Sequence, residues 1–276
     1  MAFDAQFLGV TAAMPRVRAD AGASECVDLA YVHFSVLLDP VRRFARVTGV
    51  NVDGAYLIDL ARGGDEWRLD ERVPADWQAG PEVYARNDLD RGHLVRRRDP
   101  VWGAPAVAAR ANADTFHYTN AAPQAAGFNQ SKALWLGLED HVLAYAETTA
   151  QRLSVFTAPV LGDADPEYRG IRVPLRFWKV VAWNAGAALA TTAFVLDQSP
   201  LVDTSELRGA GAGSGGAAVP PLGPFRTFQV PVGEVALATG LDMPELVAAD
   251  VLPPTAIAAG PRLLGSLEDV LLSPSR

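Results

Sequence analysis

The sequence predicts a mixed α+β fold. Segments rich in β-branched and aromatic residues recur along the chain, whereas only one long segment has a clear helical period. Strands and helices do not alternate regularly, which argues against a parallel βαβ architecture. Apolar residues make up 49% of the 276 positions, enough to bury a sizeable core.

The predicted strands lie on both sides of the middle of the chain. Tyr31–Asp39 is expected to form one strand, and Val47–Ile58 another, with a turn signal at Asp53–Gly54. Asn184 and Gly186 break the longest apolar stretch, so it predicts two strands and a turn rather than a membrane span. Further strand-like segments cover 153–161, 177–183, 188–196 and 225–232.

The segment Phe128–Arg152 is predicted to be the main helix. Asn129 or Ser131 can cap its N-terminus. The polar segment 61–81 contains Gly63–Gly64 and is expected to be a loop. Apolar side chains recur in the helix at spacings of three and four, at Leu134, Trp135, Leu138, Val142 and Tyr145.

One folded domain is expected over residues 30–250. Residues 1–29 form an N-terminal extension, and residues 251–276 form a proline-containing tail that we expect to be irregular. The Gly/Ala-rich segment 209–223 predicts a flexible surface loop rather than a domain boundary, because the strand-like remainder is too short to fold alone.

The charge distribution indicates one basic region on an acidic protein. The formal net charge is -8, but residues 84–98 hold five arginines against two aspartates, a local balance of +3. Such a region suits contact with a polyanion at one place, although a solvated loop is the simpler alternative.

The single cysteine excludes an intramolecular disulfide. The N-terminus resembles no classical signal peptide, so we expect a soluble protein that is cytoplasmic or exported by a non-classical route.

His93, in the short segment LDRGHL, is a candidate general base. Imidazole titrates near neutral pH and can accept a proton from water. Gly92 allows a close backbone approach or a sharp turn, and Arg91 presents a fork of donors that suits phosphate. The alternative is a structural histidine hydrogen-bonded to the backbone.

The sequence downstream of His93 favours the catalytic alternative. The ordered motifs DRGH, DTF-x-x-TN-x-x-PQ, FNQ and W-x-x-LED together resemble those of the DNA/RNA non-specific endonuclease family. The resemblance covers about residues 30–245 and is densest over 84–140. It implies a central antiparallel sheet flanked by helices, with a ββα-metal (His-Me finger) active site.

The resemblance also implies a role for each site residue. His93 corresponds to the general base, and Arg91 to the arginine that supports the phosphate. Asn129 corresponds to the direct ligand of Mg²⁺, for which Mn²⁺ is expected to substitute. Asn120 corresponds to an asparagine that shapes the pocket, and Glu139 to a carboxylate that holds the water shell of the metal.

Two features depart from the family pattern. The step from Asn129 to Glu139 is ten residues, where the family has eight. On an unbroken helix the two spacings place the carboxylate roughly 80° to opposite sides of the asparagine. A distal arginine is also expected upstream of the histidine; Arg62 is best placed, with Arg68 and Arg72 as alternatives.

The expected activity is Mg²⁺-dependent hydrolysis of DNA and RNA to 5′-phosphate ends. The expected partners are the nucleic acid substrates, and no membrane partner is expected. A homodimer and a protein inhibitor are left open. A catalytically decayed nucleic-acid binder is the alternative, and a hydrolase of another phosphodiester is a third. Retention of both His93 and Asn129 argues against a pure binder. The arginines expected to contact substrate phosphates are Arg86, Arg96, Arg97 and Arg98.

Overall fold

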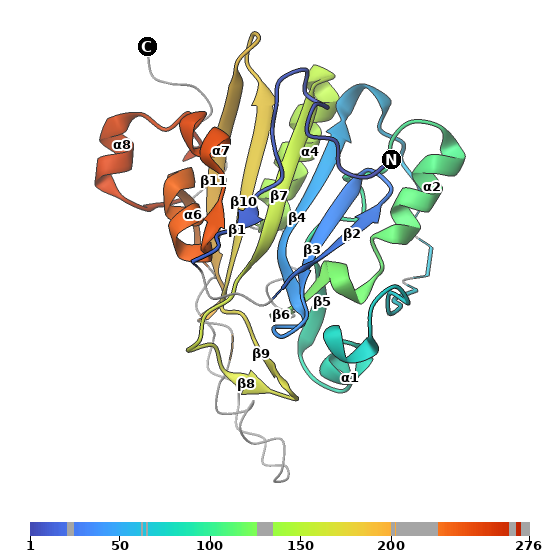
Figure 1. Ribbon diagram of the computed structural model, residues 1–276. Coiled ribbons are helices and arrows are strands. Elements are labelled where there is room, and N and C mark those ends of the chain that lie inside the picture. Colours follow the sequence, from blue (N-terminus) through green and yellow to red (C-terminus); the bar gives the residue numbers. More distant parts are fainter. Residues whose placement is uncertain are drawn as a thin grey trace.

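The computed structural model describes residues 1–20, 25–61, 63–64, 66–125, 135–199, 202, 226–264 and 269–271. An eight-stranded sheet with the order β14-β12-β11-β10-β7-β4-β3-β2 dominates the fold, and each neighbouring pair is antiparallel (Figure 1). The predicted α+β class and the antiparallel central sheet are therefore confirmed. None of the described helices is long and apolar enough to cross a bilayer.

The long central strands are buried on both faces. Along β10, Phe177 and Val181 join one apolar cluster, while Trp178 and Val180 join the other. The hairpin predicted around Asn184 is confirmed as β10–β11. The strands of this sheet are β2 Val27–Tyr31, β3 Phe34–Asp39, β4 Phe44–Asp53, β7 Arg152–Val160, β10 Arg176–Asn184, β11 Leu189–Asp197, β12 Arg226–Val230 and β14 Arg262–Leu263.

Helix α4, Trp135–Thr149, covers one face of the sheet through Leu143 and Ala146. The opposite face is covered by α6, by α7 and by the N-terminal residues (Figure 1). The other helices in the described residues are α1 Pro81–Tyr84, α2 Pro105–Asp114, α6 Val232–Thr239, α7 Pro244–Ala248 and α8 Pro254–Ala259, with 3-10 turns η1 Gly54–Tyr56, η2 Ala75–Trp77 and η3 Tyr118–Asn120.

In the part of the chain that the structure describes, three two-stranded sheets lie outside the main sheet. Strand β5, Leu89–His93, pairs with β6, Ala121–Ala125, and the chain reaches α4 after β6. This order of two strands and a helix is the ββα arrangement implied by the resemblance. The other two sheets are β1 Arg16–Val17 with β13 Leu241–Asp242, and β8 Glu167–Tyr168 with β9 Ile171–Arg172.

The strand predicted over Tyr31–Asp39 is present as β3, but it begins at Phe34 rather than at Tyr31. A turn at Val32–His33 separates β2 from β3, and His33 adopts a left-handed conformation with φ 67°. The imidazole of His33 stacks on Trp102 with 3.5 Å between ring centroids, and its Nδ1 lies 2.8 Å from the Pro100 carbonyl oxygen. These long-range contacts stabilise a turn that the local apolar pattern conceals.

Two other boundaries also differ from the prediction. Strand β4 ends at Asp53, whose carboxylate accepts a hydrogen bond from Ala55 N, so the strand does not reach Ile58. The tail is not irregular throughout, because it forms α8 and strand β14, which pairs with β12. The segment 209–223 and the first residues of the predicted helix lie outside the described residues.

Gly54 marks a close approach between α4 and the sheet. A Cβ atom at this position would lie 1.9 Å from the carbonyl oxygen of Ala146 and 2.7 Å from that of Gln151. Both obstacles are backbone atoms, which cannot rotate away as a side chain can. The Gly54 amide also donates to the Gln151 carbonyl at 2.9 Å, so the contact holds the C-terminal end of α4 against the end of β4.

Gly54→Ala is expected to lower the free energy of unfolding by about 3 kcal/mol or more, since overpacking against backbone forces α4 away from the sheet. Gly64→Ala is the matched control, because nothing lies within 4 Å of a Cβ atom there. The control should stay within about 0.5 kcal/mol of wild type. Urea unfolding of both variants measures the difference, and equal midpoints would contradict the close approach.

Candidate active site

The pairing of β5 with β6 positions His93. His93 lies opposite Ala121, and Gly92 lies opposite Ala122. A Cβ atom on Gly92 would lie 2.1 Å from the side-chain Cδ of Gln124, which is buried. A side chain at this position would therefore force the buried Gln124 side chain to move.

Aromatic rings surround the imidazole of His93. The Trp67 ring lies 4.6 Å from it between centroids, and Phe116 meets it edge-on at 5.1 Å. The guanidinium carbon of Arg91 lies 5.8 Å from the Trp67 ring, and the Arg91 side chain is exposed. His93 is thus half-buried, and an exposed cation lies near its neighbour Trp67.

Trp67 and Phe116 were not predicted as site residues. Phe116 belongs to the DTF motif, so its neighbourhood with the DRGH segment could have been expected. Trp67 lies in the polar segment 61–81, and no local pattern there indicates a contact with His93. Only the tertiary structure brings these positions together.

Asn120 supports the segment that follows His93. Its Oδ1 accepts from the Val95 amide at 2.8 Å, and its Nδ2 donates to the carbonyl oxygens of Val95 and Thr115 at 2.9 and 3.0 Å. The Leu94 amide also donates to the Asn120 carbonyl at 2.9 Å. Because the amide of this buried side chain is committed to backbone groups, Asn120 can shape the pocket but offers little to a substrate.

Glu139 lies between two cations. Its Oε1 is 3.4 Å from the Lys179 ammonium, and its Oε2 is 3.9 Å from Arg96 Nε. Arg96 also forms a short ion pair with Asp140. The Glu139 carboxylate, which is expected to support a metal, is thus linked to the central sheet through Lys179 and to the segment after His93 through Arg96.

Asp99 adds a second buried carboxylate to this region. Burial raises the pKa of Asp99 to about 6, although the nearby charges of Lys179 and Arg96 act to lower it. Asp99, Glu139 and Lys179 line a small cavity with apolar residues of β4, β7 and α4. The site therefore rests on an interior charged cluster, which the local sequence pattern does not indicate.

The arginines expected to contact substrate have different surroundings. Arg86 is exposed, with a left-handed backbone at φ 55°. Arg96 is 15% exposed and paired with the acidic residues of α4. Arg97 donates to the Leu60 carbonyl and to Asn112, while Arg98 lies 3.7 Å from Asp59. The three consecutive arginines consequently do not form one uniform exposed patch.

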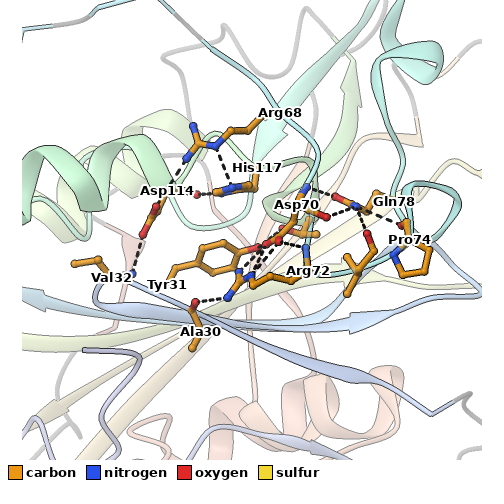
Figure 2. A network of polar contacts seen from close by, with 12 residues as sticks. Ala30, Tyr31, Val32, Arg68, Asp70, Arg72, Pro74, Gln78, Asp114 and His117 are labelled. Carbon is orange, nitrogen blue, oxygen red and sulfur yellow. Dashed lines mark hydrogen bonds and ion pairs between the residues drawn. The ribbon is translucent and has the colours of Figure 1, made fainter.

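One alternative for the distal arginine is held in a polar network (Figure 2). Arg72 donates to both carboxylate oxygens of Asp70, and its guanidinium carbon lies 4.5 Å from the centre of the Tyr31 ring. The Tyr31 hydroxyl in turn donates to Asp70 at 2.5 Å and contacts the Thr119 hydroxyl at 2.6 Å. Arg72 therefore stabilises the loop against β2 and the segment before Asn120.

Arg68 is held less tightly, at 42% side-chain exposure (Figure 2). Its Nε donates to His117 Nε2 at 3.0 Å, so His117 must carry its proton on Nδ1, which lies 2.9 Å from the Asp114 carbonyl oxygen. Burial lowers the pKa of His117, which favours this neutral form. Arg62, the preferred candidate for the distal arginine, lies outside the described residues.

The proposed metal ligand Asn129 also lies outside the described residues. Within the part of the chain that the structure describes, no three His, Cys, Asp or Glu side chains form a group that could hold a metal. Asn120 is committed to backbone groups, and Glu139 is held by cations.

Comparison with known proteins identifies the family. The sequence profile of the DNA/RNA non-specific endonuclease family matches residues 14–250. The chain belongs to this family. It is also 41% identical over 229 residues to the uncharacterized protein y4fB of Sinorhizobium fredii (strain NBRC 101917 / NGR234). The match covers 80% of this chain but 34% of y4fB, so the chain spans about a third of the length of that relative.

A solved structure has a similar fold. A chain in the crystal structure of the EndoG/EndoGI complex, which concerns the mechanism of EndoG inhibition, matches with a TM-score of 0.57. The match covers 80% of this chain and 86% of that chain at 18% sequence identity. This similarity supports the fold of the non-specific endonuclease family.

Asp99→Asn is expected to remove a pH dependence of stability. The folded protein keeps Asp99 protonated up to about pH 6, whereas the unfolded chain releases that proton near pH 3.8. The stabilisation from Asp99 is therefore present at low pH and is lost as the pH rises through this window. The loss is on the order of 3 kcal/mol in the free energy of unfolding.

Urea unfolding between pH 4 and pH 7 measures this effect as the difference between wild type and variant. The exposed carboxylate of Asp163 provides the control, and Asp163→Asn should keep the wild-type pH dependence. If the free energy of unfolding changes with pH in the same way for wild type and for Asp99→Asn, the pKa of Asp99 is not raised.

Proposed function

We propose that this protein is a Mg²⁺-dependent, sugar-nonspecific endonuclease that hydrolyses DNA and RNA to 5′-phosphate ends. The observation that supports the proposal most strongly is the position of His93 in the ββα arrangement of a non-specific endonuclease chain. His93 is half-buried against Trp67 and Phe116, and the exposed Arg91 lies beside the same tryptophan.

In the proposed reaction His93 acts as the general base. Its imidazole takes a proton from water, and the water oxygen attacks phosphorus in line with the bond to the 3′-oxygen. That bond breaks, so the phosphate remains on the 5′-oxygen of the downstream fragment, and the departing 3′-oxygen takes up a proton from water to become a hydroxyl. Arg91 offers guanidinium donors to the phosphate oxygens, and the aromatic rings restrict the orientation of the imidazole.

The residues available suit a hard divalent cation. Asn129 would supply one amide oxygen, and Glu139 would act through water, which agrees with the preference of Mg²⁺ for oxygen ligands and retained waters. Mn²⁺ has similar preferences, whereas zinc favours the Cys and His groups that the described residues do not bring together. When bound, the ion would stabilise negative charge on the phosphate as a Lewis acid.

Indifference to base and sugar follows if the protein contacts phosphates, because these carry no sequence information. Arg86 and Arg91 are exposed and suit this purpose. Arg97 and Arg98 could contribute from their partly buried positions. Arg96 is a weaker candidate, since its guanidinium already pairs with Asp140 and Glu139.

We also propose a protein inhibitor and a homodimer as partners. The inhibitor proposal is supported by the EndoG/EndoGI complex, in which a protein of similar fold is inhibited by another protein. Sedimentation of the purified protein would test the homodimer.

His93→Ala is expected to lower the cleavage of supercoiled plasmid and of RNA by at least about 100-fold, because general-base catalysis contributes that much to the chemical step. Binding of DNA should be unchanged, since the base acts after docking. Wild type should cut both substrates with Mg²⁺ and neither substrate with EDTA. Gel assays with purified proteins measure cleavage and binding.

His33→Asn is the matched control. Asparagine tolerates the left-handed backbone at this turn, and the His33 imidazole stacks on Trp102, away from the Trp67 contact with His93. The control should cut at the wild-type rate. Wild-type protein that binds DNA but cuts neither substrate would favour the catalytically decayed binder instead.

A further inference from the structure

Lys179 is a charged residue in the middle of the central sheet. Its side chain is 2% exposed, whereas lysine is almost never fully buried unless it is paired. By strand alternation it lies on the same face of β10 as the core residues Phe177 and Val181. This is the face that α4 covers, so an apolar side chain would suit the position.

The partners of Lys179 belong to different parts of the site. Its ammonium donates to the Thr157 hydroxyl of β7 at 2.9 Å and lies 3.4 Å from the Glu139 carboxylate of α4. The other oxygen of Glu139 faces Arg96, in the segment that continues from His93. Asp99 of that segment shares the cavity with Lys179 and Glu139.

This cluster is poorly explained by stability alone. A buried ion pair must repay the desolvation of both charges, and replacing it with apolar residues is often neutral or stabilising. The charges of the two cations, Lys179 and Arg96, offset those of the two carboxylates, Glu139 and Asp99. This balance lowers the cost of burying the four charges but does not make their burial a source of stability. What the cluster does provide is a fixed geometry among the sheet, α4 and the His93 segment.

We propose that Lys179 is a positioning residue of the active site. Through Glu139 it fixes the first turns of α4 relative to the segment that carries His93. The inference rests on the proposed nuclease function, because it assigns Lys179 a role toward the metal-supporting carboxylate of that same site. Groups that orient metal-supporting residues typically change metal affinity or activity by about 10- to 100-fold when removed.

Two variants distinguish a role of Lys179 in positioning Glu139 from a role in neutralising the buried carboxylates. Lys179→Met alone leaves Asp99 and Glu139 against Arg96, and the buried negative charge is expected to weaken the fold. Lys179→Met combined with Asp99→Asn removes one charge of each sign and should restore the thermal midpoint close to that of wild type. A purely structural Lys179 would regain full function in this double variant, whereas a positioning Lys179 would not.

Two functional readouts are needed for the double variant. With excess Mg²⁺ and a duplex oligonucleotide, kcat should fall by about 10-fold or more while KM stays within about twofold. Without nucleic acid, Mn²⁺ binding measured by electron paramagnetic resonance of the free ion should weaken by about 10-fold. Thr157→Val, which removes only the hydroxyl that anchors Lys179, should shift both quantities in the same direction by a smaller factor.

Arg46→Met combined with Asp39→Asn is the matched control. These residues form an ion pair between β4 and β3, in which Arg46 is 18% exposed and Asp39 is 1% exposed. Removing it should leave kcat and Mn²⁺ affinity unchanged. Wild-type kcat and Mn²⁺ affinity in the Lys179→Met, Asp99→Asn variant would overturn the positioning role. A wild-type protein that cuts no nucleic acid would overturn the proposed function instead, and the Mn²⁺ comparison would still decide the role of Lys179.

Discussion

The need to balance charge in a poorly solvated interior constrains the whole site. The carboxylate of Glu139, in the second turn of α4, can be mostly buried only because Lys179 and Arg96 offset its charge. Lys179 can lie within the sheet only because Thr157 and the carboxylates surround it. Since these groups come from β10, β7, α4 and the segment after His93, the cluster couples the placement of the helix to that of the general base.

The position of His93 depends on a second set of contacts, made by the backbone. Strand β5 pairs with β6, and Gly92 leaves room for the buried Gln124. The Asn120 side chain then holds Val95, two residues after His93, through two hydrogen bonds to its backbone, and a third bond ties it to the Thr115 carbonyl. The imidazole is thus presented by rigid elements, which suits a group that must meet water and phosphate in one orientation.

Much of this arrangement could be predicted from the sequence, because several motif residues are local in the chain. His93, Asn120 and the β10–β11 hairpin belong to segments with distinctive patterns, and the fold class followed from those patterns. The contact of Trp67 with His93 and that of Lys179 with Glu139 depend on tertiary packing between distant segments. The turn at His33 was missed for the same reason, since the stacking of Trp102 overrides an apolar run typical of a strand.

In the proposed reaction, one site cuts DNA and RNA by activating water rather than a sugar hydroxyl. Digestion of RNA and DNA in ¹⁸O-labelled water, followed by mass spectrometry of the fragments, tests this most directly. Attack by water should give 5′-phosphate ends with one ¹⁸O atom incorporated at each cleavage, for both substrates. RNA fragments that end in a 2′,3′-cyclic phosphate would contradict attack by water. Fragments that carry the phosphate on their 3′ ends, with no ¹⁸O at the 5′ ends, would also contradict the proposed reaction.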